Sequence, residues 1–205
     1  MKEIFYDWGG ANVWLFHAIN NIRFEWLDKV MQLGTALADH TIFSLYLSML
    51  TLFVLVAANK SSLDDSQHRT QVMRLFAVVA VFSISYLFDG WLLGFLKPLL
   101  DFPRPPLALP NGTVNIIGTP EYHHSLPSGH SSFAMVVVAS LWPILNRNWR
   151  IAGVIFVVWV GLSRMSLGAH FPADVLAGFL SSLAVVLLVT IAIRKLIRIT
   201  ITPSN

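Results

Sequence analysis

Long apolar runs are the feature that most limits how this chain can fold. Residues 41–58, 75–96 and 175–193 each approach the ~20 consecutive apolar residues that a helix needs to cross a bilayer. Asp89 is the only charged residue inside these three runs. They therefore predict three membrane-spanning helices.

The composition agrees with this interpretation. The chain has 205 residues, of which 55% are hydrophobic and 12% are charged, as is typical of a polytopic membrane protein with one domain, here residues 1–205. It contains no cysteine, which excludes disulfides, thiol nucleophiles and cysteine metal ligands. The net charge of +3 is small and does not indicate a nucleic-acid partner.

Two shorter apolar runs, residues 131–145 and 151–162, could be re-entrant segments or full crossings. If the polar residues beside them belong to the same helices, these helices cover about 128–146 and 149–167. Each then spans roughly 28 Å at ~1.5 Å per residue. The fold class that we expect is an all-α membrane bundle with five spans, whose polar clusters lie at helix ends.

Residues 1–34 are harder to assign because apolar and charged residues alternate along them. An interfacial amphipathic helix and a weak sixth span both fit this pattern, ahead of a bundle over residues 35–198. Glu3 and Asp7 precede any long apolar run, so we expect no cleaved leader.

The basic residues predict an orientation, because short cytoplasmic loops of membrane proteins are enriched in lysine and arginine. Three interhelical or terminal regions share this enrichment: Lys60, Arg69 and Arg74; Arg147 and Arg150; Arg194, Lys195 and Arg198. If these regions are cytoplasmic, then Lys97, Arg104 and Arg164 lie at the opposite membrane face. Taken singly, Lys97 or Arg104 could also be an interfacial anchor that snorkels beside the headgroups.

Three polar clusters lie on that opposite side and have a motif-like spacing. Residues 97–105 begin with Lys97 and end with Arg104-Pro105, and residues 127–130 read Pro-Ser-Gly-His. The third cluster runs from Ser163-Arg164 through His170 to Asp174. Cations, two histidines and a carboxylate at helix ends indicate a phosphate-handling site.

The ordered set of clusters resembles the type 2 phosphatidic acid phosphatase superfamily, whose motifs also occur in vanadium haloperoxidases. Lys97 and Arg104-Pro105 match its first motif, 127–130 the second, and Ser163-Arg164, His170 and Asp174 the third. The resemblance covers residues 40–197 and implies a six-span helical bundle. The poorly apolar first segment departs from that pattern.

Each residue type suits one part of phosphoryl transfer. His170 is the candidate nucleophile, the role that the family gives its matching histidine, and Asp174 would hold its ring if both lie on one helical face. His130 would protonate the leaving oxygen and then activate water. The expected phosphate ligands are Lys97, Arg104, Ser128, Gly129 and Arg164. This chemistry requires no metal or cofactor.

Other polar and small residues receive structural interpretations. We predict that Asp89 is a hydrogen-bonded packing contact and that Gly90 and Gly94 support close helix packing. His123, His124 and Glu121 resemble a metal site weakly and are expected to line the substrate entrance. Ser163 could donate one further hydrogen bond to the phosphoryl group.

The function that we expect is hydrolysis of a lipid phosphate or pyrophosphate through a phosphohistidine. Undecaprenyl pyrophosphate is the favoured substrate, in a bacterial inner membrane with the site facing the periplasm or cell exterior. Phosphatidylglycerol phosphate, phosphatidic acid and lipid A phosphates remain open. A lipid phosphotransferase with the same site and a non-catalytic lipid transporter or scaffold are the alternatives. The sequence does not predict an oligomeric state.

Overall fold

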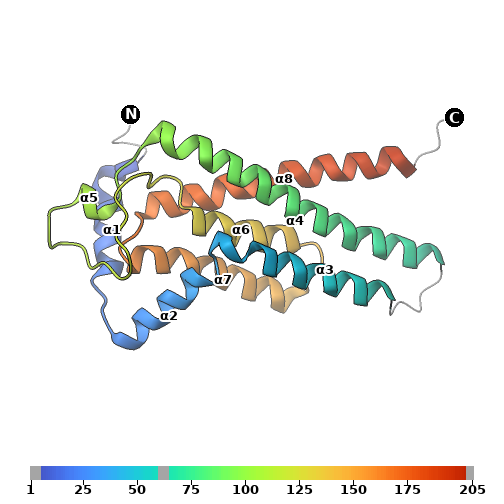
Figure 1. The fold of residues 1–205 in the computed structure, drawn as a ribbon, viewed down its shortest axis with the longest axis horizontal. Coiled ribbons are helices and arrows are strands. Elements are labelled where there is room, and N and C mark those ends of the chain that lie inside the picture. Colours follow the sequence, from blue (N-terminus) through green and yellow to red (C-terminus); the bar gives the residue numbers. More distant parts are fainter. Residues whose placement is uncertain (1–5, 60–64, 202–205) are drawn as a thin grey trace.

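The computed structural model describes residues 6–59 and 65–201, with the backbone alone for 65–67 and 198–201. The secondary structure of these residues is entirely helical, as predicted. Figure 1 shows an elongated bundle in which long helices run side by side and shorter helices gather at one end. The α-helices are α1 Ala11–Asn20, α2 Glu25–Ala36, α3 Phe43–Asn59, α4 Asp65–Leu100, α5 Pro105–Ala108, α6 Gly129–Leu141, α7 Arg147–Ser166 and α8 Pro172–Ile201.

Within the described residues, α3, α4, α7 and α8 are long and apolar enough to cross a membrane. Their outward faces carry large apolar side chains such as Phe53, Leu87 and Leu188, which are more than half exposed. Such a surface suits contact with lipid tails. Helix α6 is also apolar but has only 13 residues, so the number of crossings remains a prediction.

Helix α6 lies at the centre of the bundle and contacts α4, α7 and α8. Small residues, among them Ser131, Ser132 and Ala134, are fully buried along it and allow this crowding. The predicted helix over 128–146 was too long, because α6 ends at Leu141. Pro143 explains the early end, since proline has no N–H for the carbonyl one turn earlier and its ring clashes there.

Asp89 joins three helices through hydrogen bonds, which confirms the packing interpretation. Its carboxylate accepts from Ser132 Oγ of α6 at 2.6 Å and from Ser182 Oγ of α8 at 2.7 Å. The side chain is 1% exposed, and these bonds offset part of the cost of burying a carboxyl group. The prediction for Gly90 and Gly94 was wrong: both are exposed, and a Cβ added to either would meet nothing within 4 Å.

Gly178 brings the start of α8 against the start of α6. A Cβ at this position would lie 2.5 Å from the carbonyl oxygen of Ser128, so only glycine permits the approach. One turn earlier, the backbone N–H of Ser128 donates to the carbonyl of Asp174 at 3.0 Å. The second and third motifs therefore meet through their backbones.

The N-terminal region forms two short helices, α1 and α2, instead of the single helix or span that we expected. Buried asparagines attach α1 to the bundle: Asn12 accepts from the N–H of Ala173, and Asn20 donates to carbonyls of Asn115 and Ser166. Polar residues of this segment are thus not all solvent-facing, because these two asparagines are docking contacts. Helix α2 packs along α7.

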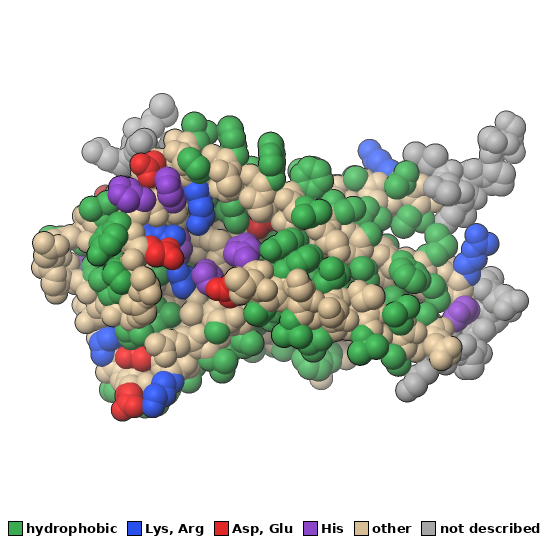
Figure 2. Space-filling model, in the orientation of Figure 1, with side chains coloured by type: hydrophobic (Ala, Val, Ile, Leu, Met, Phe, Trp, Pro, Cys, Tyr) green, Lys and Arg blue, Asp and Glu red, His purple; other side chains and the backbone are tan. Residues whose placement is uncertain are grey.

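Charged side chains concentrate toward the two ends of the molecule, with apolar side chains between them (Figure 2). Arg74, Arg150 and Arg194 line one common cavity, which confirms that α4, α7 and α8 bring these arginines to the same end. Lys60 lies outside the described residues, and so does the side chain of Arg198. Which end faces the cytoplasm remains a prediction.

Candidate active site

His170 lies in the turn between α7 and α8, where it is 1% exposed. Gly168 has φ +77°, and its position against the carbonyl of Asn115 leaves no room for a Cβ. The N–H of His170 donates to the carbonyl of Arg164 at 3.2 Å. We predicted that His170 and Asp174 share a helical face if the helix begins at His170. Helix α8 begins only at Pro172, so this condition is not met.

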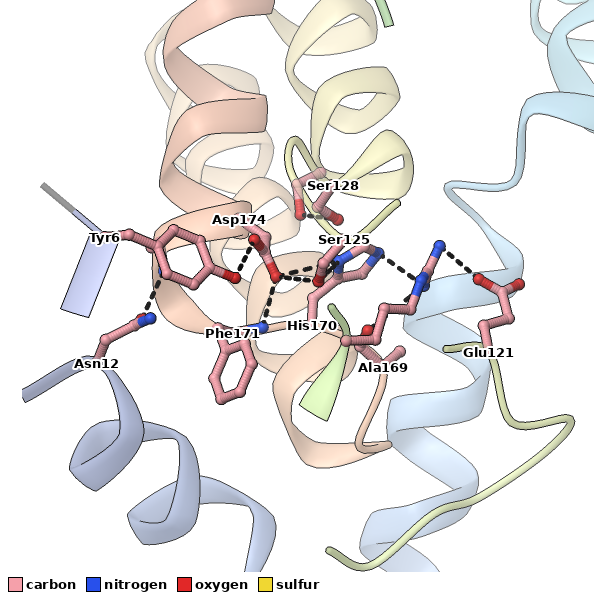
Figure 3. Close-up of polar contacts among 12 residues, drawn as sticks. Tyr6, Asn12, Glu121, Ser125, Ser128, Ala169, His170, Phe171 and Asp174 are labelled. Atoms are coloured by element: carbon pink, nitrogen blue, oxygen red, sulfur yellow. Dashed lines mark hydrogen bonds and ion pairs between the residues drawn. The ribbon is translucent and has the colours of Figure 1, made fainter. Parts of the chain in front are cut away.

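Asp174 nevertheless pairs with His170, because the turn before α8 folds the imidazole back over the first turn of that helix. Its Oδ2 lies 3.4 Å from His170 Nδ1 and accepts from Ser125 Oγ at 2.5 Å and from the N–H of Phe171 at 2.8 Å. Its Oδ1 accepts from the hydroxyl of Tyr6 at 2.8 Å. Both carboxylate oxygens are held, which orients the group firmly (Figure 3).

Arg104 lies on the other side of the imidazole and determines its tautomer. Its Nη1 is 3.2 Å from His170 Nε2. A guanidinium has no acceptor, so Nε2 must carry the lone pair and Nδ1 the proton. The Nδ1–H faces Asp174, and Nε2 faces the cationic group that the sequence assigns to phosphate. This is the arrangement that a nucleophilic imidazole requires.

Burial lowers the pKa of His170 well below its usual value, and the positive charges of Arg104, Arg164 and Lys97 lower it further. The imidazole is therefore the neutral, nucleophilic form at neutral pH. The same observation places the three predicted cations close enough to His170 to act on its charge, as a single phosphate site requires.

Arg104 is held in place by both charge and backbone contacts. Its Nε donates to the carbonyl of His123 at 2.9 Å, and its Nη2 forms an ion pair of 2.5 Å with Glu121. Glu121 is more than half exposed, whereas Arg104 is nearly buried. The carboxylate thus covers Arg104 from the solvent side, which agrees with a position at the entrance.

The start of α6 forms the floor of the site. Ser128 is the N-cap residue, as predicted, but its hydroxyl makes no capping bond and accepts instead from Ser131 Oγ at 3.0 Å. A Cβ on Gly129 would come within 3.9 Å of Lys97 Nζ, so the ammonium of α4 lies beside this helix start. A helix N-terminus with an adjacent cation is a favourable place for a phosphate.

His130 is the second residue of α6 and is about one quarter exposed. Its Nε2 is 3.6 Å from the carboxylate of Asp39. The hydroxyl and N–H of Thr41 donate to Asp39, which lowers the pKa of that carboxyl. Burial and the positive charge of Arg164 lower the pKa of His130 to about 3, and the carboxylate of Asp39 offsets only part of this shift.

Arg164 lies in the last turn of α7, next to the site, and its side chain is almost fully buried. Nη1 donates to Thr35 Oγ1 at 2.5 Å, while Nε has no hydrogen-bond partner among the described residues. A buried donor of this kind suits an incoming phosphate oxygen. Ser163 bonds back to the carbonyl of Val160 at 2.7 Å, which argues against the contact that we had expected from it.

His123 and His124 flank Asp101, with Nδ1 distances of 3.7 and 3.2 Å to its carboxylate. Glu121 turns away from them toward Arg104. Within the described ranges, no group of three or more His, Cys, Asp or Glu side chains is arranged to hold a metal ion.

Several residues at the site were not predicted from the sequence, among them Tyr6, Asp39 and Ser125. Ser125 lies three residues before Ser128, and this proximity to a motif was a usable signal. Tyr6 and Asp39 lie in segments with no motif and reach the site only through the docking of α1 and α2. For these two, the local sequence contains no signal.

The match with known protein families agrees with this geometry. The sequence profile of the PAP2 superfamily matches residues 77–198, which include all three motifs and most of the bundle. The chain belongs to the PAP2 superfamily. Membership accounts for the order of the three motifs along this PAP2 chain and confirms the resemblance seen in its sequence.

Two curated relatives are bacterial proteins called lipid A 1-phosphatase. The one from Rhizobium etli is 29% identical over 131 residues, which cover 62% of this PAP2 chain and 55% of the relative. The one from Rhizobium johnstonii is 29% identical over 138 residues, which cover 65% and 55%. The matched region therefore spans about half the length of these relatives.

Two solved structures share the fold of this PAP2 chain. LpxE from Aquifex aeolicus has a TM-score of 0.69 and 22% identity, covering 87% of this chain and 94% of that one. A transmembrane PAP2 type phosphatidylglycerolphosphate phosphatase from Bacillus subtilis has a TM-score of 0.67 and 24% identity, covering 98% and 90%. With its apolar helices, this likeness identifies the chain as an integral membrane protein.

Proposed function

We propose that this chain is a lipid phosphatase that works through a phosphohistidine intermediate. The observation that carries the proposal is the line of contacts from Tyr6 through Asp174 and His170 to Arg104 (Figure 3). It presents an unprotonated Nε2 to a cationic pocket and holds the opposite ring nitrogen against a carboxylate. Phosphoryl transfer needs both features.

In the first step, His170 Nε2 attacks phosphorus and the bond from phosphorus to the lipid oxygen breaks. The leaving oxygen takes a proton from His130, which the negative charge of the bound phosphate, together with that of Asp39, would hold in its protonated form. Arg104, Arg164 and Lys97 neutralise the equatorial oxygens, and the start of α6 contributes its dipole. The positive charge that develops on His170 faces Asp174.

In the second step, His130 removes a proton from water, and the water oxygen attacks the phosphohistidine. The bond from phosphorus to nitrogen breaks, inorganic phosphate leaves, and His170 returns to its neutral form. The same geometry would permit transfer to a lipid hydroxyl in place of water. Hydrolysis is the simpler proposal, because His130 is partly exposed and water can reach it.

For the substrate, we favour a lipid A 1-phosphate over undecaprenyl pyrophosphate. The support is that both curated relatives are called lipid A 1-phosphatase, while one structural neighbour is called a phosphatidylglycerolphosphate phosphatase. Near the site, Trp14 and Trp26 expose more than 60% of their surface on α1 and α2. Exposed tryptophan suits the headgroup layer, where a lipid phosphate is presented. We place the site on the periplasmic face of a bacterial inner membrane.

The test is phosphate release by the purified protein in detergent micelles. The panel contains lipid A 1-phosphate, phosphatidylglycerol phosphate, phosphatidic acid and undecaprenyl pyrophosphate, each with and without an acceptor lipid and a chelator. We expect release without an acceptor, fastest from lipid A 1-phosphate and unaffected by the chelator. Strict acceptor dependence would favour transfer, and strong inhibition by chelator would contradict the metal-free mechanism.

Replacing Tyr6 with phenylalanine tests whether this hydroxyl positions Asp174. Tyr6→Phe removes one of the bonds that hold the carboxylate, and a hydrogen bond to a charged group is worth about 1.5–3 kcal/mol. We expect kcat to fall about tenfold to a hundredfold, with KM nearly unchanged. Steady-state kinetics on the best substrate measure both parameters.

The matched control is Tyr46→Phe, which removes a hydroxyl that donates to the carbonyl of Leu37 at 3.0 Å, away from Asp174. The control should keep wild-type kcat. If both variants behave alike, Tyr6 has only a structural role.

A further inference from the structure

The early end of α6 has a consequence at the end of the bundle away from His170. Helices α4 and α8 continue well past Leu141, where α6 stops (Figure 1). A cavity of about 740 Å³ lies between them, closed on one side by the turn from Trp142 to Ile144. This volume falls within the range of binding pockets for small molecules, about 300–1,000 Å³.

A large part of the lining of this cavity is apolar. It is formed by aliphatic side chains of α4, α8 and the turn after α6: Val78, Val81, Ile144, Ile193 and Ile197. An apolar lining within a membrane bundle suits a hydrocarbon chain much better than a hydrophilic ligand.

Three arginines from three helices also line the cavity: Arg74 of α4, Arg150 of α7 and Arg194 of α8. Arg150 lies over the ring of Trp142, with 5.2 Å between its guanidinium carbon and the ring centroid. Among the described residues that line the cavity there is no aspartate or glutamate to balance them. Three guanidinium groups around one hollow form an anion site, because each repels the others until an anion arrives.

Two buried polar atoms in the lining strengthen this interpretation. Within the described part of the chain, Ser140 Oγ and Arg150 Nε have no hydrogen-bond partner. Ser140 is only 1% exposed. An unpaired buried donor is costly, and such groups are usually satisfied by a ligand or by ordered water.

We propose that this cavity binds an anionic phospholipid, with the phosphate headgroup against Arg74, Arg150 and Arg194 and an acyl chain along the apolar wall. The basic residues predict that this end faces the cytoplasm, where membranes carry anionic lipids. A free phosphate would match the arginines but leave the aliphatic wall without a partner. This lipid site is separate from the catalytic pocket and does not depend on the proposed phosphatase activity.

The experiment counts bound lipids by native mass spectrometry of the full chain in detergent, titrated with phosphatidylglycerol. Phosphatidylcholine and inorganic phosphate are the comparison ligands. The test variant is the triple substitution Arg74→Gln, Arg150→Gln and Arg194→Gln. The matched control is Arg69→Gln, Arg147→Gln and Lys195→Gln, which removes the same charge at the same end from residues that do not line the cavity.

We expect wild type and control to bind phosphatidylglycerol tighter than phosphatidylcholine. In the test variant the Kd for phosphatidylglycerol should rise about a hundredfold, as the loss of three charge contacts of ~1 kcal/mol each implies. Equal binding by the test and control variants would overturn the proposal. Equal affinity for phosphatidylcholine would also overturn it, because the arginines would then not recognise an anionic headgroup. Equal affinity for inorganic phosphate would overturn it as well, because the acyl chain would then contribute nothing to binding.

A filling variant keeps the test decisive if the triple variant does not fold. Ala77 lines the cavity from α4, so Ala77→Phe places an aromatic ring inside it without changing the charge. This variant should lose phosphatidylglycerol binding at least tenfold while it keeps the thermal unfolding temperature of the lipid-free protein. Unchanged binding by Ala77→Phe would mean that the lipid lies elsewhere.

Discussion

Replacing His170 with asparagine is expected to lower the rate of phosphate release about 10⁴-fold or more, the scale seen when a covalent nucleophile is removed. The amide is close in size to the imidazole but has no lone pair that can attack phosphorus. Stopped reactions with a radiolabelled lipid phosphate should show an acid-labile phosphoenzyme in wild type and none in His170→Asn.

The control for this substitution is His17→Asn. His17 lies on α1 at the same end of the molecule, and its ring contacts only Phe16 among the aromatic contacts that the structure describes. Its loss should leave turnover close to wild type. Release at the wild-type rate by His170→Asn would refute the nucleophile assignment, whatever the substrate.

The second large effect is expected for Asp174→Asn, with kcat lowered about 10³- to 10⁴-fold. A carboxylate that holds a catalytic histidine in one tautomer has an effect of this size elsewhere. Asp174 Oδ2 accepts from Ser125 and Phe171 and faces His170 Nδ1. If the amide nitrogen of the asparagine replaced Oδ2, its N–H groups would face the donors of Ser125, Phe171 and His170. If the amide oxygen replaced Oδ2, the imidazolium that develops on His170 would have no negative charge beside it.

Asp89→Asn is the matched control, because Asp89 is also a buried carboxylate held by two serine hydroxyls. It joins helices and is no part of the site, so this variant should lower the unfolding temperature while its folded fraction keeps kcat. Asp174→Asn should show the reverse. If both variants lost only stability, Asp174 would be a packing residue like Asp89.

Much of this site was predictable from local spacing. The cations and histidines were correctly expected at one end of the bundle, because their places relative to the apolar runs determine which helix end each one occupies. The Asp89 contact was likewise predictable, since a lone carboxylate in an apolar helix needs donors on its neighbours. The prediction of close helix packing at Gly90 and Gly94 was wrong, because a small residue permits a neighbouring helix to approach but does not require one.

Other features depended on contacts between segments that are far apart in the sequence. Tyr6 reaches Asp174 across 168 positions. The docking of α1 that brings it there rests on the buried side chains of Asn12 and Asn20. Polar side chains in such a segment can either face solvent or form hydrogen bonds with buried groups. Only the packed structure distinguishes these two cases.

The sequence alone determined that this chain is a helical membrane bundle whose three polar motifs lie at one end, because hydropathy and motif spacing are local properties. The tertiary structure alone decided which nitrogen of His170 faces the phosphate pocket, since that depends on Arg104 and Asp174 lying on opposite sides of one ring. It also decided that the space beyond the end of α6 is a cavity lined by arginines of three different helices. Both outcomes follow from how separate helices pack, and no single segment encodes that.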